Sequence, residues 1–314
     1  PHGLGQLVIA YLEKHYDEFF LYGERPFLQF RECARAREEG YGAVIPYVAY
    51  GNNVLLTQLQ LERPLDDADK ALLLLTQVGP CISYKMKKDR LVLAAGYEKK
   101  ETFPPGPSIE KNGLLHSFLV GENVQQSIWL NLLTQTDISR QKQWENGLGI
   151  PPWESMPVNE DCPIANSLKS SLMGRLLPMA RFCLLEEKTI RFTGGIIHPN
   201  HTVGFIDPSV AKKVSNNGWN ILRADPEQHP WRNLPALLSF LSGEAGTEFY
   251  SLGVHYGIKR ATFSTLEKFG LWSGGVRVGF TSGIQSFSGK DDELESEVWF
   301  RTDQIGNDWF RAFS

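Results

Sequence analysis

The chain has 314 residues, of which 42% are hydrophobic and 22% are charged. This composition is typical of a folded globular protein and excludes a wholly disordered or collagen-like chain. The sequence contains no run of about 18 uninterrupted apolar residues, so no membrane-spanning helix is expected. The net charge of −4 argues against nucleic-acid binding over the whole surface, although an average can hide local basic patches.

Helical spacing of apolar residues dominates the early part of the chain. Residues 4–20 predict an amphipathic helix, and Pro26 excludes its continuation. Asp67 is a suitable cap for a second helix over 68–78, which is expected to stop at Gly79-Pro80.

The pairing of Asn123 with Gln126 resembles a capping box and predicts a third helix with Val124, Ile128 and Leu132 on one face. Strand-like segments then accumulate over residues 181–185, 189–193, 202–206, 248–256, 261–266 and 275–280, with an apolar helix over 233–241. Helices early and strands late predict a mixed α+β fold.

The four cysteines, Cys33, Cys81, Cys162 and Cys183, form no C-x-x-C pair. This spacing supports neither a zinc ribbon nor a thioredoxin-like motif. Without a recognisable secretory signal, we expect reduced thiols in a cytoplasmic protein.

The sequence lacks common enzyme motifs. It has no phosphate-binding loop of a P-loop NTPase, no G-x-S-x-G of an α/β-hydrolase and no H-E-x-x-H. His198 and His201 are the only close histidine pair, and Pro199 between them favours a loop. A metal-dependent nuclease that combines this pair with an acidic run is one alternative. The run consists of Asp291, Asp292, Glu293, Glu295 and Glu297, and a solvated surface is its simpler explanation.

Basic residues gather in four clusters: Arg31, Arg35 and Arg37; Lys85, Lys87, Lys88 and Arg90; Lys212 and Lys213; and Lys259 and Arg260. The last pair falls between two predicted strands and therefore at an expected hairpin tip. Cations on a protruding tip can enter a DNA groove and gain affinity from phosphate neutralisation. Any single cluster is also compatible with ordinary solvated surface.

Four segments in order resemble the large subunit of the type I-E CRISPR Cascade complex, the CasA family. They are RPFLQ at 25–29, GLLHSFLVGENVQQSIWLNLLT at 113–134, PPWE at 151–154, and RADP at 223–226 running on to Trp231 and 234–238. The resemblance covers roughly residues 5–268.

The resemblance implies a non-catalytic subunit of an RNA-guided antiviral complex. Such a subunit recognises the PAM, a short motif beside the target in duplex DNA, from the minor groove, helps to open the duplex and supports nuclease recruitment. The implied partners are the guide RNA-containing Cascade subunits (backbone, guide 5′-end-capping and small subunits), double-stranded target DNA and a helicase-nuclease or another nuclease. No cofactor, metal or membrane is implied.

The resemblance also implies site residues. Lys188 matches the family's minor-groove lysine, Lys259 and Ala261 its PAM-contacting hairpin, and Arg260 the wedge of that hairpin. The family's glycine-rich DNA loop is expected after Gly79-Pro80, where this chain lacks glycines. We therefore expect Lys85, Lys87, Lys88 and Arg90 to substitute for that loop electrostatically.

The domains implied are a Cascade large-subunit globular domain over 1–270 and a C-terminal extension over 271–314. The 44 residues after 270 are too few for the family's C-terminal four-helix bundle, which is expected to be missing or replaced. A structural scaffold without PAM reading remains the other alternative.

Overall fold

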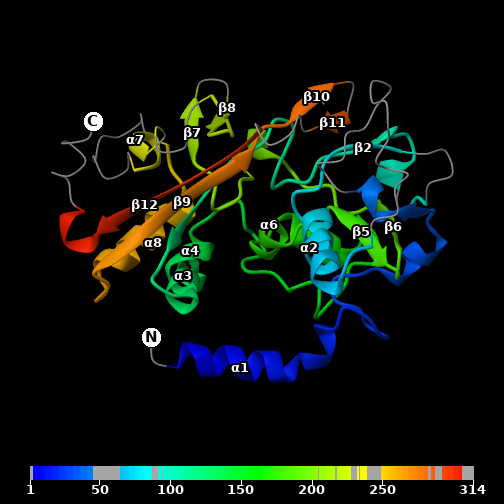
Figure 1. Cartoon of the computed structure of the whole chain (residues 1–314), viewed down its shortest axis with the longest axis horizontal. Helices are drawn as coiled ribbons and strands as arrows, with labels where there is room; N and C mark the ends of the chain where they lie inside the picture. The colour runs from blue at the N-terminus through cyan, green and yellow to red at the C-terminus, as the bar shows by residue number, and fades with distance from the viewer. Residues whose placement is uncertain are drawn as a thin grey trace. The chain divides into compact units, whose positions relative to one another are not determined.

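A computed structural model of the chain describes residues 3–44, 64–86, 91–93, 95–203, 205–215, 218–227, 232, 234–238, 249–281, 284–286 and 292–305 (Figure 1). The chain forms two compact units, and each is built from two separate stretches. Unit 1 comprises Pro1–Gly106 and Leu148–His198, and unit 2 comprises Pro107–Gly147 and Pro199–Ser314. The mixed α+β class predicted from the sequence is confirmed.

Unit 1 contains short helices around a small sheet. Its helices are α1 (Leu4–Lys14), α2 (Asp67–Val78), α5 (Pro163–Lys169) and α6 (Met173–Leu176), with single 3-10 turns at Tyr16–Glu18 (η1), Arg31–Arg35 (η2), Tyr41–Ala43 (η3) and Ala95–Tyr97 (η5). Its strands are β1 (Glu38–Gly40), β2 (Tyr84–Lys85), β3 (Thr102–Phe103), β5 (Arg181–Leu185) and β6 (Thr189–Gly194). Strands β1, β6 and β5 form an antiparallel sheet in that order, and β2 pairs with β3.

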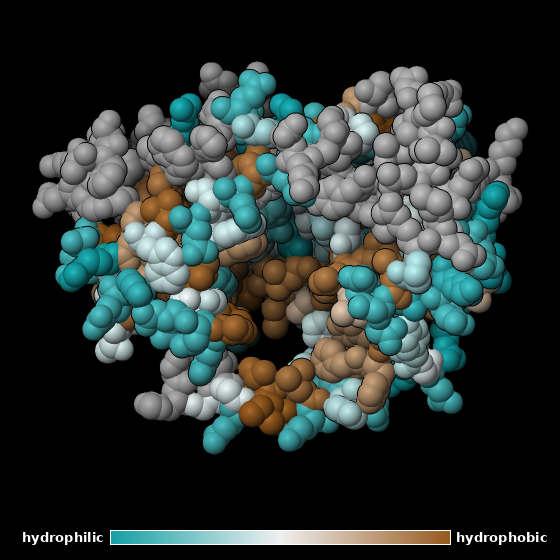
Figure 2. Space-filling view, viewed as in Figure 1, coloured by the Kyte–Doolittle hydropathy of each residue, from teal (hydrophilic) through white to brown (hydrophobic). Residues whose placement is uncertain are grey.

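Local sequence explains why the helices of unit 1 begin and end where they do. The cap of α2 is Asp66 rather than the predicted Asp67, because the Asp66 carboxylate accepts a hydrogen bond from the Asp69 amide at 2.8 Å. The helix ends before Gly79-Pro80 as predicted. Helix α1 keeps Leu7, Val8, Ile9 and Leu12 exposed, and Figure 2 shows hydrophobic surface on this helix.

Unit 2 is built around a larger antiparallel sheet in the order β12-β9-β4. Its strands are β4 (Leu115–Val120), β7 (Lys212–Ser215), β8 (Gly218–Ile221), β9 (Lys268–Val276), β10 (Gly279–Thr281), β11 (Ile284–Ser286) and β12 (Glu293–Arg301). Its helices are α3 (Val124–Asn131), α4 (Gln135–Ser139), α7 (Leu234–Leu237) and α8 (Leu252–Thr262), with 3-10 turns at His201–Val203 (η6) and Thr302–Gln304 (η10).

One face of the β12-β9-β4 sheet packs on α8 to form the core of unit 2. Leu119, Leu271 and Phe269 from the sheet meet Val254 and Ile258 from α8, and all are at most 2% exposed. This packing explains why α8 is a helix: its buried residues recur at helical spacing, and the Ser251 side chain accepts a hydrogen bond from the Val254 amide.

Three of the strand predictions are wrong. Residues 202–206 contain a 3-10 turn, and 248–256 and 261–266 fall largely on α8 and the turn that follows it. The predicted boundary at 270/271 lies within β9, the central strand of the β12-β9-β4 sheet. The described residues after Leu271 complete β9 and form β10, β11, β12 and η10.

Candidate nucleic-acid interface

One of the exposed predicted DNA contacts lies at the tip of the β5–β6 hairpin. Leu185 pairs with Ile190 at the last rung of the ladder, and the turn between the strands consists of Glu186, Glu187 and Lys188. Glu187 and Lys188 are exposed, so the Lys188 side chain is open to solvent at the tip of this hairpin. The sequence predicted both strands, and the structure confirms them within one residue.

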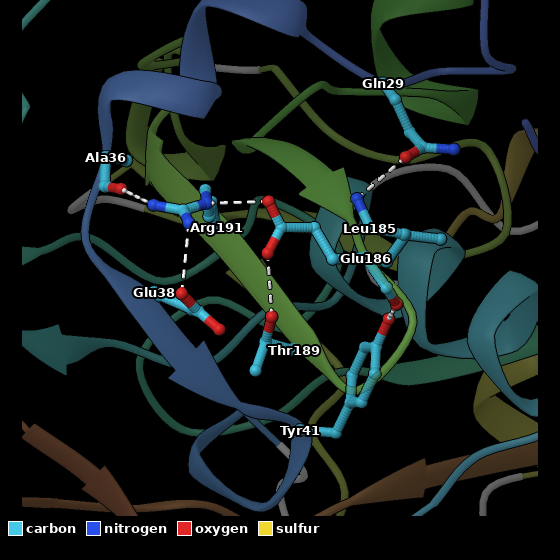
Figure 3. Close-up of polar contacts among 8 residues, drawn as sticks. All are labelled: Gln29, Ala36, Glu38, Tyr41, Leu185, Glu186, Thr189 and Arg191. Carbon is cyan, nitrogen blue, oxygen red and sulfur yellow. Dashed lines mark hydrogen bonds and ion pairs between the residues drawn. The ribbon is translucent and has the colours of Figure 1, made fainter. Parts of the chain in front are cut away.

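Arg191 holds this turn from one side (Figure 3). Its guanidinium donates to the Glu186 carboxylate at 2.8 Å, to the Glu38 carboxylate at 3.0 Å and to the Ala36 carbonyl at 2.8 Å. The Thr189 hydroxyl donates to the second Glu186 oxygen at 2.8 Å. Strand β1 and the turn of the hairpin are thereby locked to one another.

Tyr41 and Gln29 hold the hairpin from the β5 side. The Tyr41 hydroxyl donates to the Glu186 carbonyl at 2.5 Å, and the Gln29 side-chain oxygen accepts from the Leu185 amide at 2.8 Å (Figure 3). Gln29 is 5% exposed and also donates to the Leu21 carbonyl. The last residue of the RPFLQ segment therefore acts by bracing the hairpin that carries Lys188.

The bracing residues also affect the protonation of the turn. Burial by itself would raise the pKa of Glu186, but hydrogen bonds from Arg191 and Thr189 and the charge of Arg191 lower it below its ordinary value. Glu186 therefore stays ionised in moderately acidic solution, and its carboxylate keeps the turn closed.

Arg191→Met tests this brace. Because the folded-state pKa of Glu186 is lowered, its stabilising contribution is complete above the unfolded value of about 4.3 and is lost as the pH falls through the folded value. We expect the variant to unfold at lower urea than the wild type at pH 7, with a smaller difference at pH 3. Arg35→Met, which changes an exposed arginine of the same unit, is the control. An equal difference at both pH values would contradict the role given to the ion pair.

The Gly194-Gly195 pair at the end of β6 is a site of close approach. A Cβ atom at Gly194 would lie 2.3 Å from the Tyr97 ring, and one at Gly195 would lie 1.9 Å from the Met179 carbonyl oxygen. Tyr97 is buried, and its hydroxyl donates to the Gly195 carbonyl at 3.1 Å. The two glycines let the end of β6 pack against these groups.

The second predicted site, at Lys259, Arg260 and Ala261, has a different geometry from the hairpin tip expected for it. All three residues lie in the last turn of α8. Ala261 is fully buried, and Lys259 is exposed. The hairpin prediction is therefore wrong, and of the three only Lys259 presents its side chain fully to solvent.

Arg260 is engaged within unit 2 instead of projecting as a wedge. It donates to the Trp129 carbonyl at 2.7 Å and to the Leu130 carbonyl at 2.8 Å, at the C-terminal end of α3. Asp137 lies 4.0 Å away. Burial lowers the pKa of Arg260, and the Asp137 charge partly opposes this effect. A helix C-terminus has unpaired carbonyls and a negative partial charge, so Arg260 is well suited to cap it.

The basic segment after Gly79-Pro80 lies only partly within the described residues. Lys85 is exposed on β2, whereas Lys87, Lys88 and Arg90 lie outside the described residues. Cys81 and Ser83 are buried, and the Gly106 amide donates to the Cys81 carbonyl at 2.7 Å. Residues 81–83 are thus packed into unit 1, and Lys85 follows them on its surface.

The structure gives no support to the alternative metal site. Within the described ranges, which omit Asp291, no three His, Cys, Asp or Glu side chains are close enough to hold a metal ion. His198 is half-buried in unit 1 with Nε2 at 2.7 Å from the Pro178 carbonyl, and desolvation of its ring lowers its pKa to about 3. In unit 2, His201 contacts the Glu110 carboxylate at 2.6 Å. Asp292 is buried and accepts a hydrogen bond from Arg277 at 3.0 Å.

All four cysteines are buried, and none is bonded to another. Among the residues that the structure describes, no helix is long and apolar enough to cross a membrane.

Comparison with known proteins places the chain among the CRISPR-associated proteins. The family model described as CRISPR-associated protein Cse1 matches residues 4–284. The chain therefore belongs to the Cse1 family, and the resemblance noted in its sequence is confirmed. A search of curated proteins found no match.

Solved structures share the fold at low sequence identity. The CasA structure from Thermus thermophilus is 18% identical, with a TM-score of 0.62, over 94% of this chain and 55% of that one. Cse1 from Acidimicrobium ferrooxidans is 18% identical, with a TM-score of 0.62, over 98% of this chain and 58% of that one. One chain of a solved structure named "CRISPR RNA-guided surveillance complex" is 18% identical. Its TM-score is 0.65, over 98% of this chain and 60% of that one. The chain thus spans a little over half the length of these structures.

Proposed function

We propose that this chain acts as the large subunit of an RNA-guided CRISPR surveillance complex of type I-E and reads the PAM of duplex DNA with Lys188. The observation that carries the proposal is the position of Lys188, exposed at the tip of a hairpin that Arg191, Tyr41 and Gln29 hold rigid. Family membership and the fold shared with a chain of a surveillance complex support the assignment to such a complex.

The chemistry of a single lysine suits this role. A rigid, narrow hairpin can place one ammonium group in the minor groove, where donors and acceptors distinguish A·T from G·C and little else. Recognition there is expected to tolerate related PAM sequences. Because the whole chain has a net charge of −4, the subunit depends on its partner subunits for most of the phosphate contacts.

The remaining parts of the proposal concern the complex. The guide RNA, held by the backbone, 5′-end-capping and small subunits, reads the target by base pairing, and this subunit has no catalytic step of its own. It helps to open the duplex and supports recruitment of a separate nuclease. Arg260 has no part in opening the duplex, because its guanidinium caps α3. Lys259 and Lys85 remain candidate phosphate contacts.

Lys188→Ala in the assembled complex tests the proposal. We expect affinity for a PAM-bearing duplex to fall about tenfold, as one lost groove contact is worth about 1–3 kcal/mol. A duplex without the PAM should bind the variant and the wild type about equally. The measurement is an equilibrium shift assay at two salt concentrations, with Lys99→Ala, an exposed lysine of the same unit, as the control.

The outcomes separate the competing functions. Unchanged affinity and unchanged discrimination between the duplexes would refute PAM reading by Lys188 and favour a structural scaffold. An equal loss for both duplexes would assign Lys188 to the phosphate backbone. Metal-dependent cleavage of DNA by the chain alone would establish the nuclease alternative.

A further inference from the structure

The outer face of the β12-β9-β4 sheet has features that the DNA-reading role does not use. In antiparallel pairs, directly opposed residues point to the same side of the sheet. Glu297 opposes Trp272, which opposes Phe118, so these three side chains share one face. Leu271 and Leu119, one position along their strands, point into the core instead.

This outer face exposes a stacked aromatic pair. The rings of Phe118 and Trp272 lie 5.0 Å apart between centroids at an interplanar angle of 11°. Phe118 is 40% exposed although it lies in the middle of a β-strand. A Cβ atom at Gly274 would approach the Trp272 ring to 2.5 Å, so the ring lies over a glycine that leaves room for it. The result is a stack of two rings, called the platform below, in which each ring covers part of one face of the other and Phe118 is exposed.

A row of carboxylates borders the platform. Glu293, Glu295 and Glu297 alternate along β12 and are all exposed. Alternate residues of a strand lie about 7 Å apart, so the row follows the edge of the sheet. Glu295 opposes Gly274, and Glu293 opposes Val276, which places both carboxylates beside the platform.

Together these residues line a shallow groove of about 720 Å³. Its lining includes His116, Phe118, Trp272, Gly274, Glu293 and Glu295. Both ring nitrogens of His116 are occupied, one by the Ser209 hydroxyl and the other by the Ser108 carbonyl, each at 2.7 Å. Within the described part of unit 2, no salt bridge engages Glu293 or Glu295, and the cations Lys268 and Arg301 at the far end of the sheet pair with Glu122 and Asp303.

The row of glutamates by itself has a simpler explanation, since charged side chains on an edge strand discourage pairing with strands of other molecules. That explanation accounts for the row on β12. It does not account for the exposed Phe118 and the half-buried Trp272 that stack on each other on the two neighbouring strands. Aromatic faces beside carboxylates are the chemistry that binds arginine, because a guanidinium stacks on a ring while donating to a carboxylate.

We infer that this acidic aromatic groove is a docking site for an arginine-bearing segment of a partner protein. The row of carboxylates repels nucleic acid, so this surface is separate from the DNA contact proposed at Lys188 and does not depend on it. The occupant places one guanidinium on the Trp272 and Phe118 platform and directs its donors to Glu293 and Glu295.

The probe is a fluorescein-labelled Ser-Arg-Ser-Arg-Ser peptide titrated with the full chain and followed by anisotropy. We expect saturable binding that weakens about fivefold or more in the double variant Glu293→Gln/Glu295→Gln and in Phe118→Ala. The matched control is Glu145→Gln/Glu267→Gln, which removes two exposed carboxylates of the same unit away from the groove. A peptide with lysine in place of arginine should bind about threefold more weakly, since an ammonium lacks the planar stacking surface.

Several results would overturn the inference. Equal weakening by the two double variants would show non-specific attraction to an acidic protein, and unchanged binding in Phe118→Ala would exclude the platform. Absence of saturable binding would exclude the groove as an arginine site. Thermal unfolding of each variant verifies folding, and the glutamate variants keep the test decisive if Phe118→Ala is unstable.

Discussion

Arg181→Ala is expected to lower the free energy of unfolding by about 4 kcal/mol, the largest effect of any single change considered for this chain. Arg181 is 1% exposed, yet its guanidinium donates to the carbonyls of Ala180 at 2.9 Å, Ile82 at 3.0 Å and Pro104 at 2.8 Å. It also lies 4.9 Å from the centroid of the Phe103 ring. Alanine would leave a cavity and two buried carbonyls from separate segments without their donor.

The consequence extends to the basic segment of unit 1. Ile82 and Pro104 flank the short β2–β3 pair, so Arg181 ties the strand that carries Lys85 to β5. We expect the melting temperature to fall by about 10 °C and the amides of residues 81–86 to exchange faster with solvent. Arg35→Ala, at an exposed position, is the control and should change stability by at most about 0.5 kcal/mol. Equal melting temperatures for the two variants would refute the bridging role.

Arg260→Ala is expected to lower the free energy of unfolding by about 2–3 kcal/mol. The change leaves the Trp129 and Leu130 carbonyls without their charged donor and removes the guanidinium beside Asp137. The Arg260 side chain is 16% exposed, so water replaces these contacts only in part. Differential scanning calorimetry of the purified chain measures the effect.

Lys259→Ala is a closely matched control for this change. Lys259 is the preceding residue of α8, carries the same charge and is exposed. Its replacement should leave stability within about 0.5 kcal/mol. A destabilised Lys259 variant beside an unaffected Arg260 variant would contradict the capping role. An Arg260 variant that is fully stable yet fails to open duplex DNA in the assembled complex would restore the wedge.

The sequence predicted those elements whose pattern is local. Strands β5 and β6 are short segments on either side of a short polar turn. Helix α3 carries its cap in Asn123, whose side chain accepts a hydrogen bond from the Gln126 amide at 2.9 Å. Gln126 completes the motif differently from a capping box, since its side-chain oxygen accepts from Glu122 rather than from Asn123.

Helix α8 was mistaken for two strands because its environment decides its structure. The segments 248–256 and 261–266 include Phe, Tyr, Val and Thr, which favour strands when considered alone. In the fold, Gly257 allows α8 to approach the sheet so closely that a Cβ atom there would lie 2.5 Å from Leu119 Cδ1. That contact joins residues far apart in sequence, which no local pattern can show. The error placed Arg260 at a hairpin tip, where the resemblance to the family then implied a wedge.

The candidate site was found only in part for a related reason. Resemblance to the family pointed to Lys188, whereas Gln29, Tyr41 and Arg191, which brace its hairpin, were not identified. Gln29 and Tyr41 come from a segment about 150 residues away from the turn that they contact. The nearest available clue was Glu186 and Arg191 flanking the predicted turn with opposite charges.

The interleaving of the two units has a consequence for how the chain is made. Unit 1 receives its β5–β6 hairpin only after all of Pro107–Gly147, which belongs to unit 2, has been synthesised. At about 5–20 residues per second, the first 106 residues wait several seconds for the strands that complete their core. Truncation at the end of either early stretch would leave both units incomplete. Nascent chains are therefore expected to become resistant to protease late, after His198 has left the ribosome.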